Sequence, residues 1–251
     1  MTSFQPKVLR YESVSSTNNE VAQLASRGAE EGTAVVADEQ TAGRGRLQRT
    51  WTSPKGAGLY FSILLRPQIS QDRWSLITFM AALAVSDALR EACELETEIK
   101  WPNDLLASER KICGILAEVI ETTRRAVVLG IGINLTSEAY PTELVGQAVS
   151  VAELATRPVE REEILAALLR ALTLRYESLN EPDGAGRVIE EWMSRSSYGE
   201  GKLVRVTNGD EILTGITRGL EKDGALRLQL ETGAIKTIRA GDVVQVRAER
   251  K

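Results

Sequence analysis

The chain has 251 residues, with 31 Lys and Arg against 35 Asp and Glu, so its formal net charge is −4, and it contains no histidine. The missing histidine excludes Ser-His-Asp and Cys-His nucleophiles, a histidine general base and histidine-ligated metals. A hydrophobic content of 43% with 26% charged residues is ordinary for a soluble globular protein, and the mild acidity argues against a general nucleic-acid coat.

The length allows one large domain together with a small partner domain. The longest apolar stretch, residues 76–85, is too short to span a bilayer, and the N-terminal segment lacks the apolar core of a signal peptide. Cys93 and Cys113 have neither a metal-type nor a redox-type spacing. We therefore expect a cytoplasmic protein with reduced thiols.

Strand-like and helix-like patterns alternate along the first 180 residues. The predicted strands are residues 7–14, 33–38, 58–65, 98–101, 111–120 and 126–135. The predicted helices are residues 17–28, 74–93, 160–179 and 186–194. Thr17 and Glu20 have the spacing of a capping box at the start of the first helix. Residues 108–110 and 122–125 look like hairpin turns.

The sequence changes character after Ser194. Residues 194–201 read as a linker, and short β-like runs follow at residues 203–208, 211–220, 225–230, 234–240 and 243–249. Their spacing predicts a small barrel of about 50 residues. Residues 1–197 carry a net charge of −6 and residues 198–251 a net charge of +2. We therefore place the two domains at residues 1–197 and 198–251.

The most unusual segment is residues 40–51, which contains the alternating run Gly43-Arg44-Gly45-Arg46. Guanidinium groups and backbone N–H groups of such a loop suit phosphate oxygens. A Walker A loop would need a Gly-Lys-Ser/Thr ending, and a Rossmann fingerprint would need glycine where Gln48 stands. A solvated basic loop and an RNA-binding Arg-Gly element are the alternatives.

Two further segments carry polar groups at strand ends. Asn103 and Asp104 follow Pro102, which starts a turn, so they are either site residues or ordinary turn residues. Lys111 opens an otherwise apolar strand. Its ammonium belongs either to the rim of a cleft or simply to the protein surface.

Glycines interrupt two apolar strands at Gly114, Gly130 and Gly132. They remove side chains from one face, which suits a flat ligand, but a bulge or a crowded crossing explains them equally well. The run of residues 15–18, Ser-Ser-Thr-Asn, stands at a helix start. Its hydroxyl and amide groups can cap the helix and can also face a small polar ligand.

Taken in order, these segments resemble the catalytic region of bacterial biotin–protein ligases. The family pattern is Ser-Thr-Asn, Gly-Arg-Gly-Arg-x-Gly-Arg-x-Trp, Lys-Trp-Pro-Asn-Asp, Lys-x-x-Gly-Ile-Leu-x-Glu and Gly-x-Gly-x-Asn. This chain matches it at residues 16–18, 43–51, 100–104, 111–118 and 130–134. Gln48 departs from it, because the family has glycine there. The C-terminal region is similar to the family's SH3-like domain.

The resemblance implies an α+β fold. A mixed-sheet catalytic domain with flanking helices would have the class II synthetase-like fold of biotin ligases, and a small SH3-like β-barrel would follow at the C-terminus. Because the chain starts almost directly at the catalytic domain, it resembles the ligase-only class without an N-terminal DNA-binding domain. The implied substrates are biotin and ATP, with Mg²⁺ entering as the ATP complex. The implied partner is a biotin carboxyl carrier protein, with no DNA and no membrane, and with a homodimer allowed.

The implied reaction has two steps. The carboxylate of biotin attacks the α-phosphate of ATP, which gives biotinyl-5′-AMP and pyrophosphate. A lysine of the carrier protein then attacks this mixed anhydride, and AMP leaves. A carboxylate is already a nucleophile at neutral pH, so the first step needs alignment and charge neutralisation and no histidine.

The resemblance also implies roles for individual residues. Those implied for biotin are Ser16, Thr17, Asn18, Gln40, Arg44, Gly45, Arg46, Lys111, Gly114, Gly130 and Gly132. Those implied for ATP or the adenylate are Arg44, Arg46, Arg49, Trp51, Lys111 and Asn134. The catalytic groups are Lys111, Arg46 and Asp104. Asp104 would orient the acceptor lysine or a metal, and no histidine or cysteine ligand is expected.

Two other functions are compatible with parts of the sequence. A lipoate or octanoate transferase would share the fold, but the Gly-Arg-Gly-Arg and Lys-Trp-Pro-Asn-Asp segments fit biotin ligases better. A non-catalytic nucleic-acid-binding protein would use the Arg-Gly loop and the basic small barrel, and would bind with steep salt dependence. The acidic total and the missing DNA-reading domain count against it.

Overall fold

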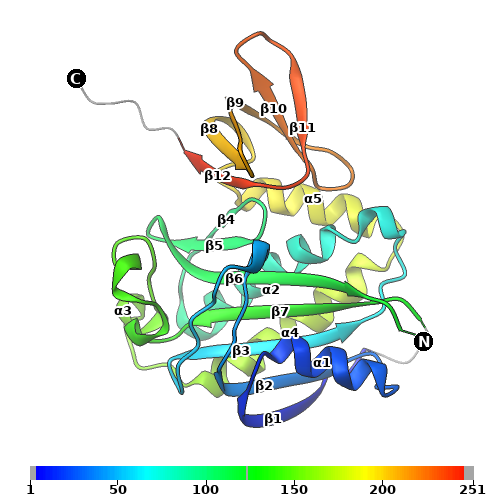
Figure 1. Cartoon of the computed structure of the whole chain (residues 1–251), viewed down its shortest axis with the longest axis vertical. Helices are drawn as coiled ribbons and strands as arrows, with labels where there is room; N and C mark the ends of the chain where they lie inside the picture. The colour runs from blue at the N-terminus through cyan, green and yellow to red at the C-terminus, as the bar shows by residue number, and fades with distance from the viewer. Residues whose placement is uncertain (1–3, 123, 246–251) are drawn as a thin grey trace.

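The structure is a computed structural model that describes residues 4–122 and 124–245. Its larger part is a seven-stranded sheet with the order β1-β2-β3-β7-β6-β5-β4 (Figure 1). The strands are β1 (Lys7–Val14), β2 (Thr33–Gln40), β3 (Gly58–Leu65), β4 (Glu98–Lys100), β5 (Asp104–Ala107), β6 (Arg110–Ile120) and β7 (Ala126–Asn134). β1 and β2 are parallel and the other neighbours are antiparallel, so the sheet is mixed, as predicted.

Helices cover both faces of this sheet (Figure 1). They are α1 (Thr17–Ser26), α2 (Leu76–Cys93), the short α3 (Val151–Leu154), α4 (Arg161–Leu179) and α5 (Gly184–Arg195). Val21 and Ala25 of α1 pack with Leu64 of β3 on one face. Phe61 and Ile63 face the core that α2, α4 and α5 build on the other. All of β3 is buried, because neither face meets water.

The start of α1 differs from the predicted capping box. Ser16 is the N-cap residue, and no side chain caps the helix there. The Thr17 hydroxyl donates instead to Gln40 Oε1 at 3.1 Å, and Glu20 accepts from the Tyr11 hydroxyl at 3.3 Å. Polar side chains at this helix start are therefore engaged with neighbouring strands.

The C-terminal part is a second sheet of five antiparallel strands, with the order β11-β10-β9-β8-β12. Its strands are β8 (Glu200–Asn208), β9 (Glu211–Leu220), β10 (Leu226–Leu230), β11 (Ile235–Ile238) and β12 (Asp242–Gln245). The predicted barrel is not closed over the described residues, because β11 and β12 have four residues each and remain edge strands. The end of the predicted run 243–249 lies outside the described residues.

The two sheets share one hydrophobic core. Val204, Leu226 and Leu228 of the small sheet belong to the same buried cluster as Trp192 of α5. The buried Trp101 indole Nε1 donates to the carbonyl oxygen of Gly224 at 3.1 Å. In the described part of the chain, no helix is long and apolar enough to cross a membrane.

Candidate active site

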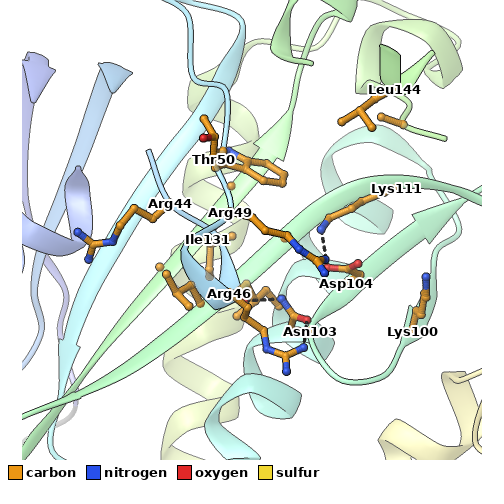
Figure 2. Close-up of a pocket in the computed structure, with 18 of the residues that line it drawn as sticks. Arg44, Arg46, Arg49, Thr50, Lys100, Asn103, Asp104, Lys111, Ile131 and Leu144 are labelled. Carbon is orange, nitrogen blue, oxygen red and sulfur yellow. Dashed lines mark hydrogen bonds and ion pairs between the residues drawn. The ribbon is translucent and has the colours of Figure 1, made fainter. Parts of the chain in front are cut away.

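A cavity of about 580 Å³ opens where the two sheets meet. Its walls come from the start of α1, the Arg-Gly loop after β2, the turn between β4 and β5, the middle of β6 and β7, and the start of β12. Figure 2 shows Arg46, Arg49, Asn103, Asp104 and Lys111 gathered in one part of it, while Arg44 points away from them. Most of the residues predicted for the site therefore converge on a single cavity.

One end of the cavity is polar and uncharged. Ser16, Thr17 and Asn18 are each at most 5% exposed. The backbone N–H of Thr17 donates to Gln40 Oε1 at 2.9 Å, and Gln40 Nε2 donates to Ser53 Oγ at 2.8 Å. These hydrogen bonds fix the hydroxyl and amide groups in place, which suits recognition of a polar uncharged ring.

Asn18 connects this end to the Arg-Gly loop. Its Nδ2 donates to Glu118 Oε2 at 2.6 Å, and Glu118 pairs with the Arg44 guanidinium at 3.2 Å. Arg44 Nη1 also donates to Asn19 Oδ1 at 2.7 Å. Arg44 is thus tied to α1 and β6, which explains its orientation in Figure 2.

The opposite end of the cavity is cationic. Lys111 Nζ lies 2.6 Å from Asp104 Oδ1 and 5.3 Å from the centre of the Trp51 ring. Arg46 Nη1 donates to Asn103 Oδ1 and to the carbonyl oxygen of Gly241, both at 3.2 Å. Burial lowers the pKa of Arg46, and the carboxylates of Asp242 and Asp104 act in the opposite direction.

The Arg-Gly loop is a small hairpin. Arg44 and Thr50 form an isolated antiparallel bridge, and the N–H of Gly45 donates to the carbonyl oxygen of Arg49 at 2.7 Å. At its tip, Leu47 and Gln48 have φ values of 54° and 58°. Gln48, which departs from the family pattern, thus occupies a left-handed position that glycine adopts more easily.

The three strand glycines make room for protein side chains. A Cβ on Gly132 would lie 2.6 Å from Trp51 Nε1, and one on Gly114 would lie 2.9 Å from Trp51 Cζ3. A Cβ on Gly130 would collide with Asn18 Oδ1. The flat group that covers these glycines is therefore the Trp51 indole, with Asn18 beside it, and the cavity lies against them.

Asn134 lies apart from the other predicted residues, and Arg49 lies at the edge of the site. Asn134 is buried and donates to the carbonyl oxygens of Lys111 and Val149, at 3.2 and 3.1 Å, so it does not line the cavity. Arg49 lines the cavity mouth, where its guanidinium pairs with Asp242 of β12. Asn134 therefore holds the backbone of β6 at Lys111.

Three polar residues that contact predicted site residues were not predicted from the sequence: Ser62, Glu118 and Asp242. Ser62 Oγ lies 2.6 Å from Asn18 Oδ1 and 2.7 Å from Thr17 Oγ1. Ser62 is the one serine or threonine in the apolar run Gly58–Leu65. A single small polar residue in a buried strand is a signal from which it could have been predicted. Glu118 ends the Lys-x-x-Gly-Ile-Leu-x-Glu segment, a signal that could have found it. Asp242 carries no local signal, because its role depends on contact with the distant Arg49.

These walls would hold a ligand with an uncharged hydrogen-bonding head and an anionic tail. A metal would have few side-chain ligands here. Among the described residues no group of three His, Cys, Asp or Glu is placed to hold an ion. The Asp104 carboxylate offers the kind of oxygen ligand that Mg²⁺ prefers. To bind Mg²⁺, it would have to give up its ion pair with Lys111.

Comparison with known proteins gives the same assignment. Residues 11–134 match the model of the biotin/lipoate A/B protein ligase family, and residues 201–245 match the biotin protein ligase C terminal domain. The bifunctional ligase/repressor BirA of Bacillus subtilis is 35% identical over 241 residues, which cover 94% of this chain and 73% of that one. The chain belongs to the biotin protein ligase family.

Other members of the biotin protein ligase family match it over most of their length. The biotin–[acetyl-CoA-carboxylase] ligase of Mycobacterium tuberculosis is 33% identical, with 92% of this chain and 86% of that one covered. The biotin protein ligase of Aquifex aeolicus, solved in complex with biotin and ATP, superimposes with a TM-score of 0.82 at 31% identity. That match covers 96% of this chain and 99% of the Aquifex chain.

Proposed function

We propose that this chain is a biotin–protein ligase. It would join biotin to ATP to give biotinyl-5′-AMP and pyrophosphate, and then transfer biotin to a lysine of a biotin carboxyl carrier protein. One observation carries the proposal. A single cavity joins an uncharged hydrogen-bonding end, around Thr17 and Gln40, to a cationic end around Arg46 and Lys111. Biotin has an uncharged ureido ring at one end and a carboxylate at the other.

The polar end would bind the ureido ring. Ser16, Thr17 and Gln40 offer hydroxyl and amide groups for its N–H and C=O groups, and Asn18 lies beside them. Gly45 and Arg46 would close over the valeryl chain. Because Glu118 holds Arg44 toward α1, we propose that Arg44 acts mainly by fixing the loop.

Adenylation needs charge neutralisation more than proton transfer. The biotin carboxylate oxygen attacks the α-phosphorus while the bond to the β-phosphate oxygen breaks, so negative charge moves onto pyrophosphate. Lys111 and Arg46 are the cations that can follow this charge, with Arg49 at the cavity mouth. Lys111 would exchange its carboxylate partner Asp104 for phosphate oxygen. Mg²⁺ would arrive with ATP and neutralise phosphate charge.

Transfer to the carrier needs a neutral amine. The acceptor lysine attacks the carbonyl carbon of the mixed anhydride, AMP leaves with the bonding electrons, and the amine loses its proton. Asp104, released from Lys111, is the nearest candidate on this wall to orient that amine and take its proton. Trp51 would stack on the adenine, and Asn134 would hold the backbone of Lys111.

Several finer points belong to the same proposal. The acceptor would be the biotinyl domain of a carboxylase, since a relative is named for acetyl-CoA carboxylase. The two domains would divide between residues 197 and 198. The protein would act in the cytoplasm, where its buried Cys93 and Cys113 stay reduced. The chain would be able to form a homodimer, and sedimentation would measure its mass in solution.

The test is direct. The protein is mixed with ATP, Mg²⁺, biotin and a biotin carboxyl carrier domain, and the carrier is probed for covalent biotin. We expect labelling that depends on both ATP and biotin and that is lost when the acceptor lysine of the carrier is replaced. Labelling with lipoate in place of biotin would favour the lipoate rival. Salt-sensitive nucleic-acid binding without labelling would favour the non-catalytic nucleic-acid-binding protein.

A further inference from the structure

The tip of the Arg-Gly hairpin is strained. Leu47 and Gln48 are the two central residues of the turn, and both are in the left-handed region, with φ values of 54° and 58°. Both side chains are exposed, and Leu47 is 65% exposed, so neither gains burial in return. Left-handed backbone is costly for residues with a Cβ. The backbone N–H of Arg49 donates to the carbonyl oxygen of Arg46 at 3.2 Å and closes the turn, and contacts that anchor the turn from outside can offset the remaining strain.

The residues that flank the turn supply this anchor. Arg46 and Arg49 are its first and last residues, and both bind the start of β12. Arg46 Nη1 donates to the carbonyl oxygen of Gly241 at 3.2 Å, and the Arg49 guanidinium is paired with the Asp242 carboxylate. Asp242 also lines the cavity. The C-terminal sheet thus holds both ends of the strained turn.

Of these two contacts, one depends on a side-chain carboxylate. The Gly241 contact uses a backbone group that no substitution removes, whereas the Arg49 contact depends on the charge of Asp242. We propose that Asp242 is a positioning residue, which keeps the Arg46–Arg49 turn closed over the cavity mouth by holding Arg49. It acts through the loop and need not touch a substrate. For its catalytic consequence, this inference rests on the proposed function.

The energetics predict a small and reversible effect. The Arg49 side chain is 63% exposed and that of Asp242 is 36% exposed, so the pair is weak by nature. Its loss should raise the open fraction of the loop about two- to five-fold. Replacing Gln48 by glycine relieves left-handed strain, partly offset by the extra freedom of the open loop, and should lower the open fraction by about the same two- to five-fold.

The loop carries its own reporter of opening. Trypsin cleaves after arginine, and Arg44, Arg46 and Arg49 all lie in the hairpin. Cleavage within residues 44–49 of the full chain, without substrates, tracks the open fraction when the loop opens and closes rapidly. Three variants are compared with wild type: Asp242→Asn, the double variant Asp242→Asn with Gln48→Gly, and Asp210→Asn. Asp210 is an exposed carboxylate in the β8–β9 turn of the same sheet and serves as the matched control.

We expect Asp242→Asn to be cleaved in the loop about two- to five-fold faster than wild type, with the melting temperature almost unchanged. In biotin-dependent ATP–pyrophosphate exchange, its KM for ATP should rise by a smaller factor while kcat changes little, because KM follows the closed fraction of the loop rather than the open fraction. The Gln48→Gly substitution should restore both values toward wild type. Asp210→Asn should match wild type in both.

The inference is overturned if Asp242→Asn is cleaved at the wild-type rate, or if its faster cleavage comes with a lower melting temperature that Gln48→Gly does not rescue. The second result would mean that Asp242 merely stabilises the small sheet. If wild type shows no exchange at all, the proposed function fails, and the cleavage comparison still decides whether Asp242 holds the loop.

Discussion

Lys111 is the side chain on which the charges of the cavity converge. Its ammonium faces the Asp104 carboxylate at 2.6 Å and the Trp51 ring at 5.3 Å, and its backbone carbonyl is held by Asn134. The side chain is 34% exposed, so it can move toward a ligand without opening the core. Removing the Lys111 side chain should therefore lower activity while leaving the fold intact.

We predict that Lys111→Ala lowers biotin-dependent ATP–pyrophosphate exchange by about 10²–10³-fold, because one cation that follows the developing phosphate charge is lost. The melting temperature should change little, because the side chain is partly exposed. Lys55→Ala, at an exposed lysine between β2 and β3, is the control and should exchange normally. Near-normal exchange by Lys111→Ala would remove Lys111 from the mechanism.

Ser62 offers a second test at this scale, because it is fully buried between Thr17 and Asn18. Ser62→Ala leaves the oxygen of Asn18 short of a partner, and we expect it to lower stability by about 1–3 kcal/mol. It should also raise the Kd for biotin, measured by calorimetry. Ser86→Ala, an equally buried serine of α2 that accepts from Thr97, should lower stability without changing biotin affinity. Equal biotin affinities in the two variants would contradict this role.

At the scale of elements, the sequence predicts the long strands and helices but only some of the short ones. The strand β3 and the helix α2 are recognised from their long apolar runs, since all eight residues of β3 and most residues of α2 are buried. β5 and α3 are missed, since four residues are too few to show a period. A capping box does exist, but it is formed by Ser150 and Glu153 at α3, far from the one predicted at α1.

That capping box should make stability depend on pH. Burial would raise the pKa of Glu153, but hydrogen bonds from Tyr140 and Ser150 and the nearby Arg110 outweigh it, so the pKa is lowered. A carboxyl with a lowered pKa stabilises the fold above its unfolded-state value, and this contribution is lost as the pH falls through the folded-state pKa.

We therefore predict that Glu153→Gln lowers the free energy of unfolding by about 1 kcal/mol at pH 7. The difference from wild type should shrink between pH 7 and about pH 3, because the contribution is lost only below the ordinary glutamate pKa of about 4, as the pH falls through the lowered folded-state value. Urea unfolding at the two pH values is the measurement. A deficit of the same size at both values would show that the charge of Glu153 is not what stabilises this turn.

At the scale of the whole molecule, the cavity is completed by contacts between distant parts of the chain. Arg46 meets Gly241, and Trp101 meets Gly224, across the boundary between the sheets. Local periodicity says nothing about such pairs, so the Arg-Gly loop could be predicted as a phosphate-binding element but its anchor on β12 could not. The motifs located the site, and the tertiary contacts determined which residues point into it.

The shared core predicts that both sheets unfold together. We expect one transition in urea, with fluorescence and circular dichroism coincident, because Trp192, Val204 and Leu226 belong to one buried cluster. Trp101→Phe removes the hydrogen bond to Gly224 and should lower the free energy of unfolding by about 1 kcal/mol within that single transition. Two separate transitions in wild type would contradict this coupling.

The Trp51 indole, which lies over Gly114 and Gly132, is placed where its fluorescence can report on the cavity. The chain has four tryptophans, and Trp74, Trp101 and Trp192 are at most 9% exposed, deep among apolar side chains. Trp51 alone is half-buried and lines the cavity. Occupation of the cavity should therefore shift the emission of one chromophore against a constant background, and Trp51→Phe should abolish the shift. The protein thus carries an intrinsic fluorescent reporter, with which ligand binding could be titrated without any label.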